Sequence, residues 1–323
     1  MPPHNPNYNS VPAFHAKLAT SRRILAVCGA GLSASSGLAT FRGAGGMWRN
    51  YEAMDLATPE AFERDPGLVW LFYAYRRHMA LQAKPNAGHY ALAELARRNP
   101  GFWCLSQNVD NLHVRADHPP SQLKLLHGSL FMLKCASPTC DYQTENYDSP
   151  LCPALAPAAV NAPASATEIH PLLDPSNPLP PLDPSTLPHC PRCPPNTSLL
   201  RPGVVWFGEP LSDPLLTSID TWIEQPNTPI DIVLVIGTSG VVWPAAGFAE
   251  QARMAGRTRE EKEKGIGASV VHVNLEAEEE GNLRRLEEGD FAFAGDAGEV
   301  LGRLLEPVLG RWEGGKGGRF VRE

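Results

Sequence analysis

Several features are missing from this sequence, and each absence narrows the class of protein. No run of about 18 apolar residues occurs in the 323-residue chain, so no transmembrane helix is expected. No long run of Lys or Arg occurs either, and the formal net charge of -7 gives no reason to expect nucleic acid as a partner. The N-terminus has no apolar stretch of the kind that forms a secretory signal. We therefore expect an intracellular protein that acts neither in a membrane nor on nucleic acid.

Acidic residues are absent before Glu52, which weakly resembles a mitochondrial presequence. A first strand is expected to begin near Arg23, however, so little could be removed without damaging the fold. The chain has seven cysteines, an odd number, and no export signal. Both features favour a reducing compartment, in which the cysteines are thiols or metal ligands. Mitochondrion, cytosol and nucleus are not distinguished by these features.

Short apolar runs predict the strands of the fold. These runs cover residues 24–28, 102–106, 123–126, 231–236 and 269–274. Helices are expected from Thr58 as N-cap with Pro59 at the first position, over about 67–82, and over about 87–98. Strands that alternate with helical stretches are typical of the α/β class. They predict a doubly wound parallel sheet, and 43% hydrophobic residues suffice for its core.

Prolines interrupt this rhythm in one region, because 15 of the 32 lie between Pro150 and Pro202. Such a stretch supplies neither helix nor central strand, so we expect an irregular insertion at 151–188. A charged stretch at 257–265 is expected to be a solvated loop.

Two cysteine pairs flank the insertion: Cys135 with Cys140, and Cys190 with Cys193. The second pair has the spacing of a zinc knuckle, and the four intervening residues of the first pair are within the permitted range. Four thiolates on two short hairpins predict one closed, structural zinc site in a small zinc-ribbon module. The long connection is tolerable because a metal ion can close it.

The remaining cysteines are expected to be free. Cys152 competes for a ligand role but has no close cysteine partner, so a free thiol is favoured. Cys28 and Cys104 lie in strand patterns and are expected to be buried core thiols.

Glycines or polar residues follow each predicted strand, where ligands of parallel sheets bind. These loops are 29–33, 107–113, 127–129, 237–239 and 274–276. A glycine turn lets the backbone approach a pyrophosphate, and a histidine such as His127 titrates near neutral pH and suits a general base. Taken singly, each loop could equally be a tight turn, a hydrogen-bonded turn or a satisfied polar side chain.

Taken together, the loops closely resemble those of a sirtuin, over about residues 11–308. The motifs occur in the family order: GAGLSASSG, TFRG, QNVDNLH, HGS, two cysteine pairs, VVWFGE, GTS and NLE. The resemblance implies a Rossmann-like domain with an inserted zinc module and NAD bound between them. Its implied boundaries are 1–130 and 204–311 for the Rossmann-like domain, with a helical insertion at about 47–85, 131–203 for the zinc module, and 312–323 for a C-terminal tail.

The resemblance also implies a role for individual residues. The expected NAD-binding residues are Gly29, Ala30, Gly31, Ser33, Phe41, Arg42, Gln107, Asn108, Asp110, Gly237, Thr238, Ser239, Asn274, Glu276 and Ala297. The expected catalytic residues are His127, as general base, and Asn108. The acyl-lysine tunnel is expected to be lined by Val204, Trp206, Phe207, Gly208 and Glu209.

The implied reaction is NAD-dependent removal of acyl groups from protein lysines. The acyl oxygen attacks the nicotinamide ribose, and His127 then deprotonates a ribose hydroxyl. The products are nicotinamide, free lysine and O-acyl-ADP-ribose. The zinc ion is expected to take no part, because four thiolates close its coordination sphere. Acylated proteins are the expected partners, and a monomer is the expected state.

The acyl preference is predicted from Tyr73 and Arg76, which share one face of a helix at spacing i,i+3. Spacing alone favours a packed tyrosine and a solvated arginine. The sirtuins that remove succinyl, malonyl and glutaryl groups, however, carry a Tyr-x-x-Arg pair here, and the loop 40–46 with Ala44 resembles theirs. Arg and Tyr can together grip a carboxylate. The alternatives are a general deacetylase and a non-catalytic NAD-sensing scaffold, although a scaffold would be expected to lack His127 or Asn108.

Overall fold

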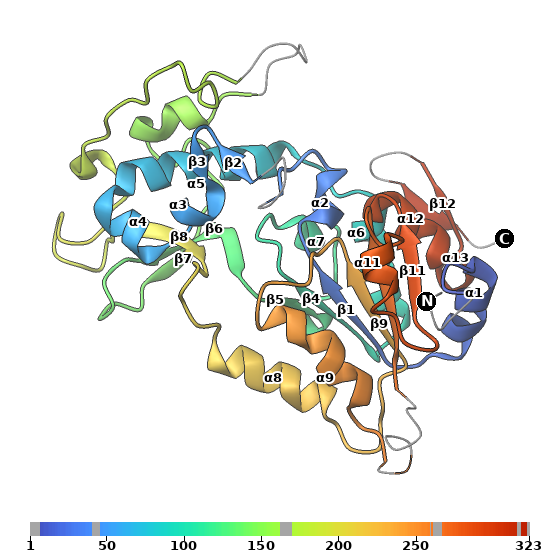
Figure 1. Ribbon diagram of the computed structural model, residues 1–323. Helices are drawn as coiled ribbons and strands as arrows, with labels where there is room; N and C mark the ends of the chain where they lie inside the picture. The colour runs from blue at the N-terminus through green and yellow to red at the C-terminus, as the bar shows by residue number, and fades with distance from the viewer. Residues whose placement is uncertain are drawn as a thin grey trace.

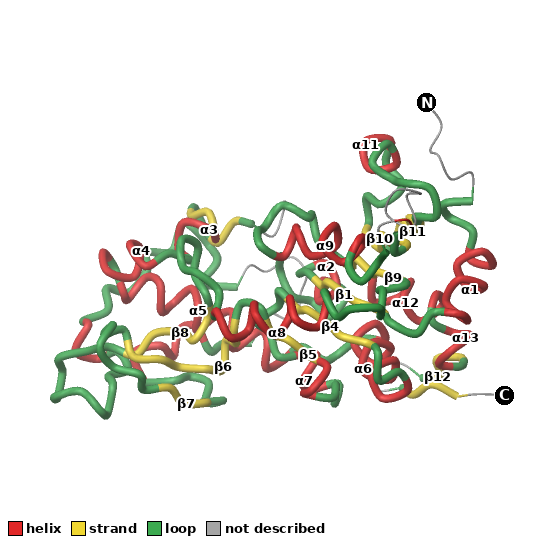
Figure 2. Tube along the Cα trace, turned by 90° about the horizontal axis from the view of Figure 1, so that it is seen from below, coloured by secondary structure: helices red, strands yellow, loops and turns green. Residues whose placement is uncertain are grey.

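A computed structural model describes residues 7–40, 46–161, 170–258, 260, 267–314 and 318–321. Within these ranges, no helix is long and apolar enough to cross a membrane. The elements fall into two groups that lie at opposite ends of the molecule in both views (Figures 1 and 2).

The first group is built on a six-stranded sheet in which all pairings are parallel. Its strands are β1 (Ile24–Cys28), β4 (Phe102–Ser106), β5 (Leu123–Leu125), β9 (Ile232–Ile236), β10 (Ser269–Asn274) and β11 (Phe291–Ala294). Their order is β11-β10-β9-β1-β4-β5. The chain therefore runs outward from β1 to one edge and then resumes at β9 on the other side, so the sheet has a topological switch point between β1 and β9. The predicted doubly wound sheet is confirmed.

Alternation along β1 explains how helices cover both faces of the sheet. Ile24, Ala26 and Cys28 pack with helices α1 (Val11–Thr20), α6 (Ala87–Arg98), α12 (Ala297–Leu304) and α13 (Glu306–Leu309). Leu25 and Val27 pack with helices α8 (Asp213–Ile223) and α9 (Phe248–Met254) on the opposite face (Figure 1). Successive side chains of a strand point to opposite faces, so a strand buried on both sides has to be apolar throughout.

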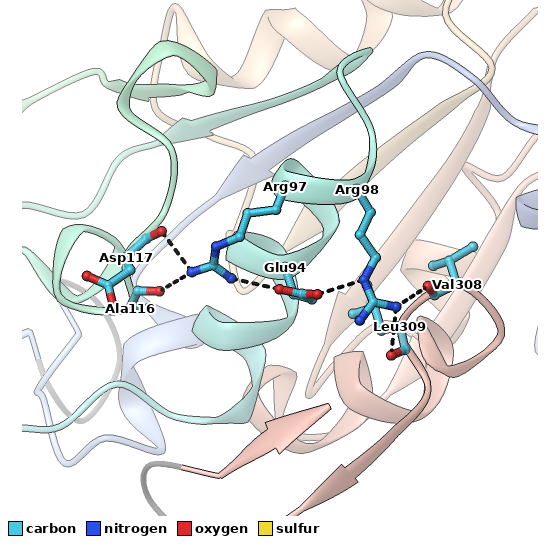
Figure 3. A network of polar contacts seen from close by, with 7 residues as sticks. All are labelled: Glu94, Arg97, Arg98, Ala116, Asp117, Val308 and Leu309. Carbon is cyan, nitrogen blue, oxygen red and sulfur yellow. Dashed lines mark hydrogen bonds and ion pairs between the residues drawn. The ribbon is translucent and has the colours of Figure 1, made fainter. Parts of the chain in front are cut away.

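A polar network fastens α6 to the ends of two other helices (Figure 3). Glu94 lies between Arg97 and Arg98, with N···O distances of 2.8 and 2.6 Å. Arg97 also donates to the carbonyls of Ala116 and Asp117, just after α7 (Leu112–Arg115), and Arg98 donates to those of Val308 and Leu309, the last two residues of α13. Cations at helix C-termini are favourable because the last carbonyls have no partner within the helix.

The second group combines a small sheet with a helical layer. Strands β6 (Gly128–Cys135), β7 (Gln143–Glu145) and β8 (Leu200–Val204) form an antiparallel sheet in the order β7-β6-β8. The helices are α3 (Ala53–Leu56), α4 (Pro59–Arg64) and α5 (Pro66–Gln82), preceded by a hairpin of β2 (Met47–Trp48) and β3 (Tyr51–Glu52). Both parts share one apolar core, in which Trp70 and Phe131 are fully buried. Thr58 caps α4 from the predicted position.

The described parts of the Pro-rich insertion, 151–161 and 170–188, are irregular, as predicted, except for two short 3-10 helices, η3 (Pro153–Ala158) and η4 (Pro184–Thr186). Each has proline at its start, where the missing N–H costs no hydrogen bond. The 257–265 stretch lies mostly outside the described residues. Within the C-terminal segment, where a tail at 312–323 is expected, β12 (Arg311–Glu313) and β13 (Arg319–Val321) pair in antiparallel fashion, and Trp312 stacks on Tyr90 at 5.6 Å between ring centroids.

Candidate active site

One cavity of about 750 Å³ lies where the two groups of elements meet. All the predicted site residues that the structure describes line it, apart from the four zinc ligands. Those of the sheet group and its loops are Gly29, Ala30, Gly31, Ser33, Gln107, Asn108, Asp110, His127, Gly237, Thr238, Ser239, Asn274, Glu276 and Ala297. Those of the second group and the loop after it are Tyr73, Arg76, Val204, Trp206, Phe207, Gly208 and Glu209. The predictions for Phe41 and Arg42 concern residues outside the described ranges.

Glycines allow the loops after β1 and β9 to touch at the switch point. Gly31 N–H donates to the Gly237 carbonyl at 2.8 Å. A Cβ on Gly29 would lie 2.7 Å from both Gly237 O and the Thr238 Cβ, which is too close for any side chain. Gly237 itself has φ of +56°, a conformation that L-residues with a side chain rarely adopt. This contact exposes backbone at the cavity floor, as a close approach to a bound pyrophosphate requires.

Three predicted residues form a buried hydrogen-bond network beside this floor. Asn108 Nδ2 donates to Gly29 O at 3.0 Å and to Ser33 Oγ at 3.1 Å. Ser33 Oγ donates in turn to Asp110 Oδ2 at 2.6 Å. Burial raises the pKa of Asp110, although the hydrogen bonds from Ser33 and from Leu112 N–H act in the opposite direction. The network fixes Asn108 and Asp110 against the glycine turn before any ligand arrives.

His127 is held in one tautomer by the backbone. Its Nδ1 lies 3.0 Å from the Gln107 carbonyl oxygen, which can only accept, so Nδ1 carries the proton and Nε2 keeps its lone pair. Burial lowers the pKa of His127 below the ordinary 6.5, despite the opposing hydrogen bond to Gln107. The imidazole is therefore neutral at pH 7, with Nε2 ready to accept a proton.

The far end of the cavity is more open. Gln107 Nε2 donates to Thr238 Oγ1 at 3.2 Å and so joins the loops after β4 and β9. Ser239 and Glu276 are exposed at the rim. Ala297 is buried at the first position of α12, which Asp296 caps by accepting from Gly298 N–H. Short polar and small side chains leave room there for a flat group.

Larger side chains form the other end of the cavity. Tyr73 is 2% exposed, and its hydroxyl accepts from Trp206 Nε1 at 3.0 Å. Burial raises the pKa of Tyr73 well above 10, so the hydroxyl keeps its proton. Arg76 lies one helical turn further along α5 and donates to Ala39 O at 3.3 Å. Burial lowers the Arg76 pKa, while Tyr73 and Asp110 act to raise it. A phenol and a guanidinium thus share one wall.

The adjacent Arg77 shows that only one of the two arginines faces this wall. Arg77 is 1% exposed, donates to the carbonyls of Leu130, Asn146 and Asp148, and lies over the Phe131 ring. It joins α5 to the small sheet, whereas Arg76 lines the cavity.

Sequence reasoning missed the residue that shapes the 204–209 loop. Arg201 pairs with Glu209 through both carboxylate oxygens, at 2.6 and 2.8 Å, and lies over the Trp206 ring at 3.4 Å. Glu209 also accepts from Trp206 N–H at 2.9 Å. Glu209 therefore holds the loop in shape rather than presenting a free carboxylate. No sequence motif includes Arg201, because Arg201 meets its partner Glu209 only when the loop after β8 folds back.

The four predicted zinc ligands converge at the end of the small sheet. The Sγ atoms of Cys135, Cys140, Cys190 and Cys193 all lie within 4.8 Å of one another. Cys135 and Cys193 are 3.6 Å apart, and Cys140 and Cys190 are 3.8 Å apart. Sulfurs about 2.3 Å from a tetrahedral zinc lie roughly 3.8 Å apart, whereas a disulfide is about 2.05 Å long. The geometry fits a closed zinc site.

Comparison with known proteins gives the same answer as this geometry. The Sir2 family model matches residues 29–244, which include the glycine turn, the polar network, His127 and all four cysteines. The chain belongs to the Sir2 family. It is 41% identical over 313 residues to an NAD-dependent protein deacylase of Candida albicans, covering 92% of this chain and 97% of the relative. It is 42% identical over 298 residues to the mitochondrial NAD-dependent protein deacylase sirtuin-5 of Danio rerio, covering 91% and 86%.

Solved structures of Sir2 homologues share the fold. A Sir2 homologue in complex with NAD is similar with a TM-score of 0.69 and 32% identity, covering 94% of this chain and 96% of that one. A triple mutant of a Sir2 homologue in complex with 2′-O-acetyl ADP ribose gives a TM-score of 0.68 and 33% identity, covering 91% and 94%. The chain thus shares its overall fold with these Sir2 homologues.

Proposed function

We propose that this sirtuin removes acidic acyl groups, succinyl, malonyl and glutaryl, from protein lysines in an NAD-dependent reaction. Relatives that match nine-tenths of the chain are named NAD-dependent protein deacylases, and several of them are named sirtuin-5. The observation that supports the acyl preference is the placement of Tyr73 and Arg76 in the same cavity as His127. A neutral acyl group would need neither a buried phenol nor a cation there.

NAD would lie along the sheet edge, with its phosphates over the loops of Gly29 and Gly237. Bound there, it supplies a ribose carbon that becomes electrophilic as nicotinamide leaves. Asn108 and Asp110, fixed through Ser33, would orient the nicotinamide end by hydrogen bonds. Ser239, Asn274 and Glu276 would hold the adenosine end at the rim.

His127 would act as the general base through Nε2. The Gln107 carbonyl fixes the ring and accepts from Nδ1, so an incoming proton has only one nitrogen to bind. Depression of the His127 pKa by burial keeps this base unprotonated at neutral pH. The proton would come from a ribose hydroxyl, which then attacks the acyl carbon.

The acyl-lysine would enter between the 204–209 loop and α5. The Trp206 ring stacks with the Arg201 guanidinium and donates its N–H to the Tyr73 hydroxyl. In this position it would contact the aliphatic part of the acyl chain. The distal carboxylate would meet Arg76 and the Tyr73 hydroxyl. A guanidinium–carboxylate hydrogen bond shielded from water contributes roughly 1.5–3 kcal/mol, which is about a tenfold or greater preference.

Substitution of Arg76 tests the acyl preference. Arg76→Met keeps an unbranched, flexible side chain but removes the charge and the hydrogen-bond donors, so we expect kcat/KM for a succinyl-lysine peptide to fall at least tenfold and that for the acetyl-lysine peptide to stay within about twofold. The matched control is Arg64→Met, an exposed position on α4, which should change neither. Undiminished succinyl activity in Arg76→Met would refute the carboxylate contact.

A general deacetylase is the second candidate, because the sheet-edge residues and His127 would serve any acyl group. It would show similar kcat/KM values for acetyl and succinyl peptides and equal sensitivity of both to Arg76→Met. A non-catalytic scaffold is disfavoured, since His127 and Asn108 are both present and positioned.

A further inference from the structure

A second cluster of side chains that can bind a metal ion lies in the core next to the glycine turn. The Sγ atoms of Cys28 and Cys104 and a ring nitrogen of His113 all lie within 4.8 Å of one another. Both thiols are 0% exposed, and His113 is 1% exposed. The three residues come from β1, β4 and α7, so only the folded chain brings them together.

The two sulfurs are spaced as in the zinc cluster. Cys28 Sγ and Cys104 Sγ are 3.7 Å apart, between the 3.6 and 3.8 Å of the zinc cysteines. That distance is close to the roughly 3.8 Å expected for two thiolates on one tetrahedral ion.

A disulfide between the same two cysteines is disfavoured by strand register. Cys104 pairs with Ala26, and Cys28 pairs with Ser106, so the two cysteines are offset by two residues on neighbouring strands. Two residues of rise and one strand spacing separate their Cα atoms by roughly 8 Å. Disulfides rarely span more than about 7 Å without backbone movement. A metal ion, in contrast, bridges sulfurs at their present distance.

His113 supplies the independent sign of a ligand. Neither ring nitrogen of His113 has a hydrogen-bond partner within the described residues, although the ring is buried. A buried polar atom without a partner costs about 1–3 kcal/mol, so native proteins rarely leave one unless an ion or water completes the site. The neighbouring rings of His89 and His118 pack edge-on at 5.1 and 6.0 Å and do not satisfy it by hydrogen bonding.

We propose that Cys28, Cys104 and His113 bind a second metal ion, a thiophilic d10 cation such as Cu⁺ or Zn²⁺. Two thiolates and an imidazole are the donors these ions prefer. Binding would displace the two thiol protons, leave His113 neutral, and give one ion with two sulfur ligands and one nitrogen ligand. The site is closed off from solvent by apolar side chains of the same core cluster, such as Phe102 and Leu32, and by the rings of His89 and His118.

The position of the site ties it to the cavity. Cys28 immediately precedes Gly29, and His113 lies three residues after Asp110. An ion there would link β1, which leads into the Gly29 turn, to β4 and α7, which flank the loop that carries Asn108 and Asp110. It would therefore stabilise the cofactor end without touching substrate. The zinc cluster belongs to the small sheet of the second group of elements.

Metal stoichiometry of the full-length protein tests the proposal. One equivalent of Cu⁺, or in parallel of Zn²⁺, is added to the zinc-containing protein, and both metals are counted per chain after desalting. We expect two metal ions per chain in the wild type and in the control Cys152→Ala, but one in Cys104→Ala. NAD binding and circular dichroism establish that each variant is folded.

Two results would overturn the proposal. One is a count of one metal ion per chain both after addition of Cu⁺ and after addition of Zn²⁺. The other is copper uptake that is matched by zinc release and unchanged in Cys104→Ala, because the zinc cysteines would then be the copper site. If Cys104→Ala does not fold, X-ray absorption of the copper-loaded wild type decides. Two sulfurs and one nitrogen support the site, and a shell of three or four sulfurs contradicts it.

Discussion

The two ends of the cavity, which we call the cofactor end and the acyl end after their proposed occupants, are built in different ways. The cofactor end consists of glycines and short polar side chains on loops that directly follow the parallel strands, such as Gly29 after β1 and Gly237 after β9. The acyl end consists of large side chains from α5 and the 204–209 loop, among them Tyr73 and Trp206, which meet only because two separate segments pack together. The first end is set by local backbone, and the second by tertiary packing.

This difference explains why the cofactor end can bind a dinucleotide through backbone groups, whereas the acyl end can select between acyl groups through side chains. Strand ends in a parallel sheet always converge at one edge, so a dinucleotide site can be built with little side-chain volume. An acyl pocket has to exclude some groups and attract others, which needs the volume and charge of residues such as Trp206 and Arg76. Substitutions at the cofactor end should therefore affect all acyl substrates alike, and those at the acyl end should separate them.

The largest effect is expected for His127→Ala. Loss of a positioned general base lowers rates typically about 10²- to 10⁴-fold, and we expect this loss for acetyl and succinyl peptides alike. NAD affinity, measured by calorimetry, should change little. The control His15→Ala removes a ring that contacts the Arg303 carbonyl and the Phe14 ring, neither of which lines the cavity, and should retain full activity. A variant of His127 with more than a tenth of wild-type kcat would contradict the assignment.

A smaller effect is expected for Gly29→Ala at the cofactor end. The new methyl group would lie 2.7 Å from Gly237 O and force the two loops apart. Overpacking of this kind costs about 1–3 kcal/mol, so the KM for NAD should rise roughly tenfold or more with every acyl peptide. Gly302→Ala is the matched control, because nothing lies within 4 Å of its Cβ position in α12. An unchanged KM for NAD in Gly29→Ala would contradict the proposal that the Gly29 turn binds the cofactor.

The smallest effect is expected for Tyr73→Phe at the acyl end. The buried Trp206 N–H would lose its acceptor, which should lower the free energy of unfolding by about 1–2 kcal/mol in denaturant titrations. The KM for a succinyl peptide should rise severalfold, while the acetyl peptide is affected less. Equal effects on both peptides would mean that the phenol only supports Trp206.

The sequence predicts the cofactor end well for a physical reason. Each loop is a contiguous motif after an apolar strand, so the residues from Gln107 to His113 and those from Gly237 to Ser239 could be placed at one sheet edge without coordinates. The cysteine pairs could be matched by spacing alone. Strand β11 and the C-terminal hairpin were not predicted, because four and three residues carry too little periodicity.

The acyl end could not be derived from spacing in the same way. Tyr73 and Arg76 share a helix face, but nothing local distinguishes Arg76, which lines the cavity, from Arg77, which is buried against the small sheet. The contact of Arg201 with Trp206 and Glu209 depends on how the loop after β8 folds back. Only the family resemblance pointed to Tyr73 and Arg76, and nothing in the sequence pointed to Arg201.

The most direct test of the account is turnover of one peptide carrying acetyl-, malonyl- or succinyl-lysine, followed by mass spectrometry with and without NAD. We predict NAD-dependent loss of the succinyl and malonyl groups at least tenfold faster than loss of acetyl. A preference for acetyl would leave the Sir2 family assignment intact and contradict the acidic pocket of Tyr73 and Arg76.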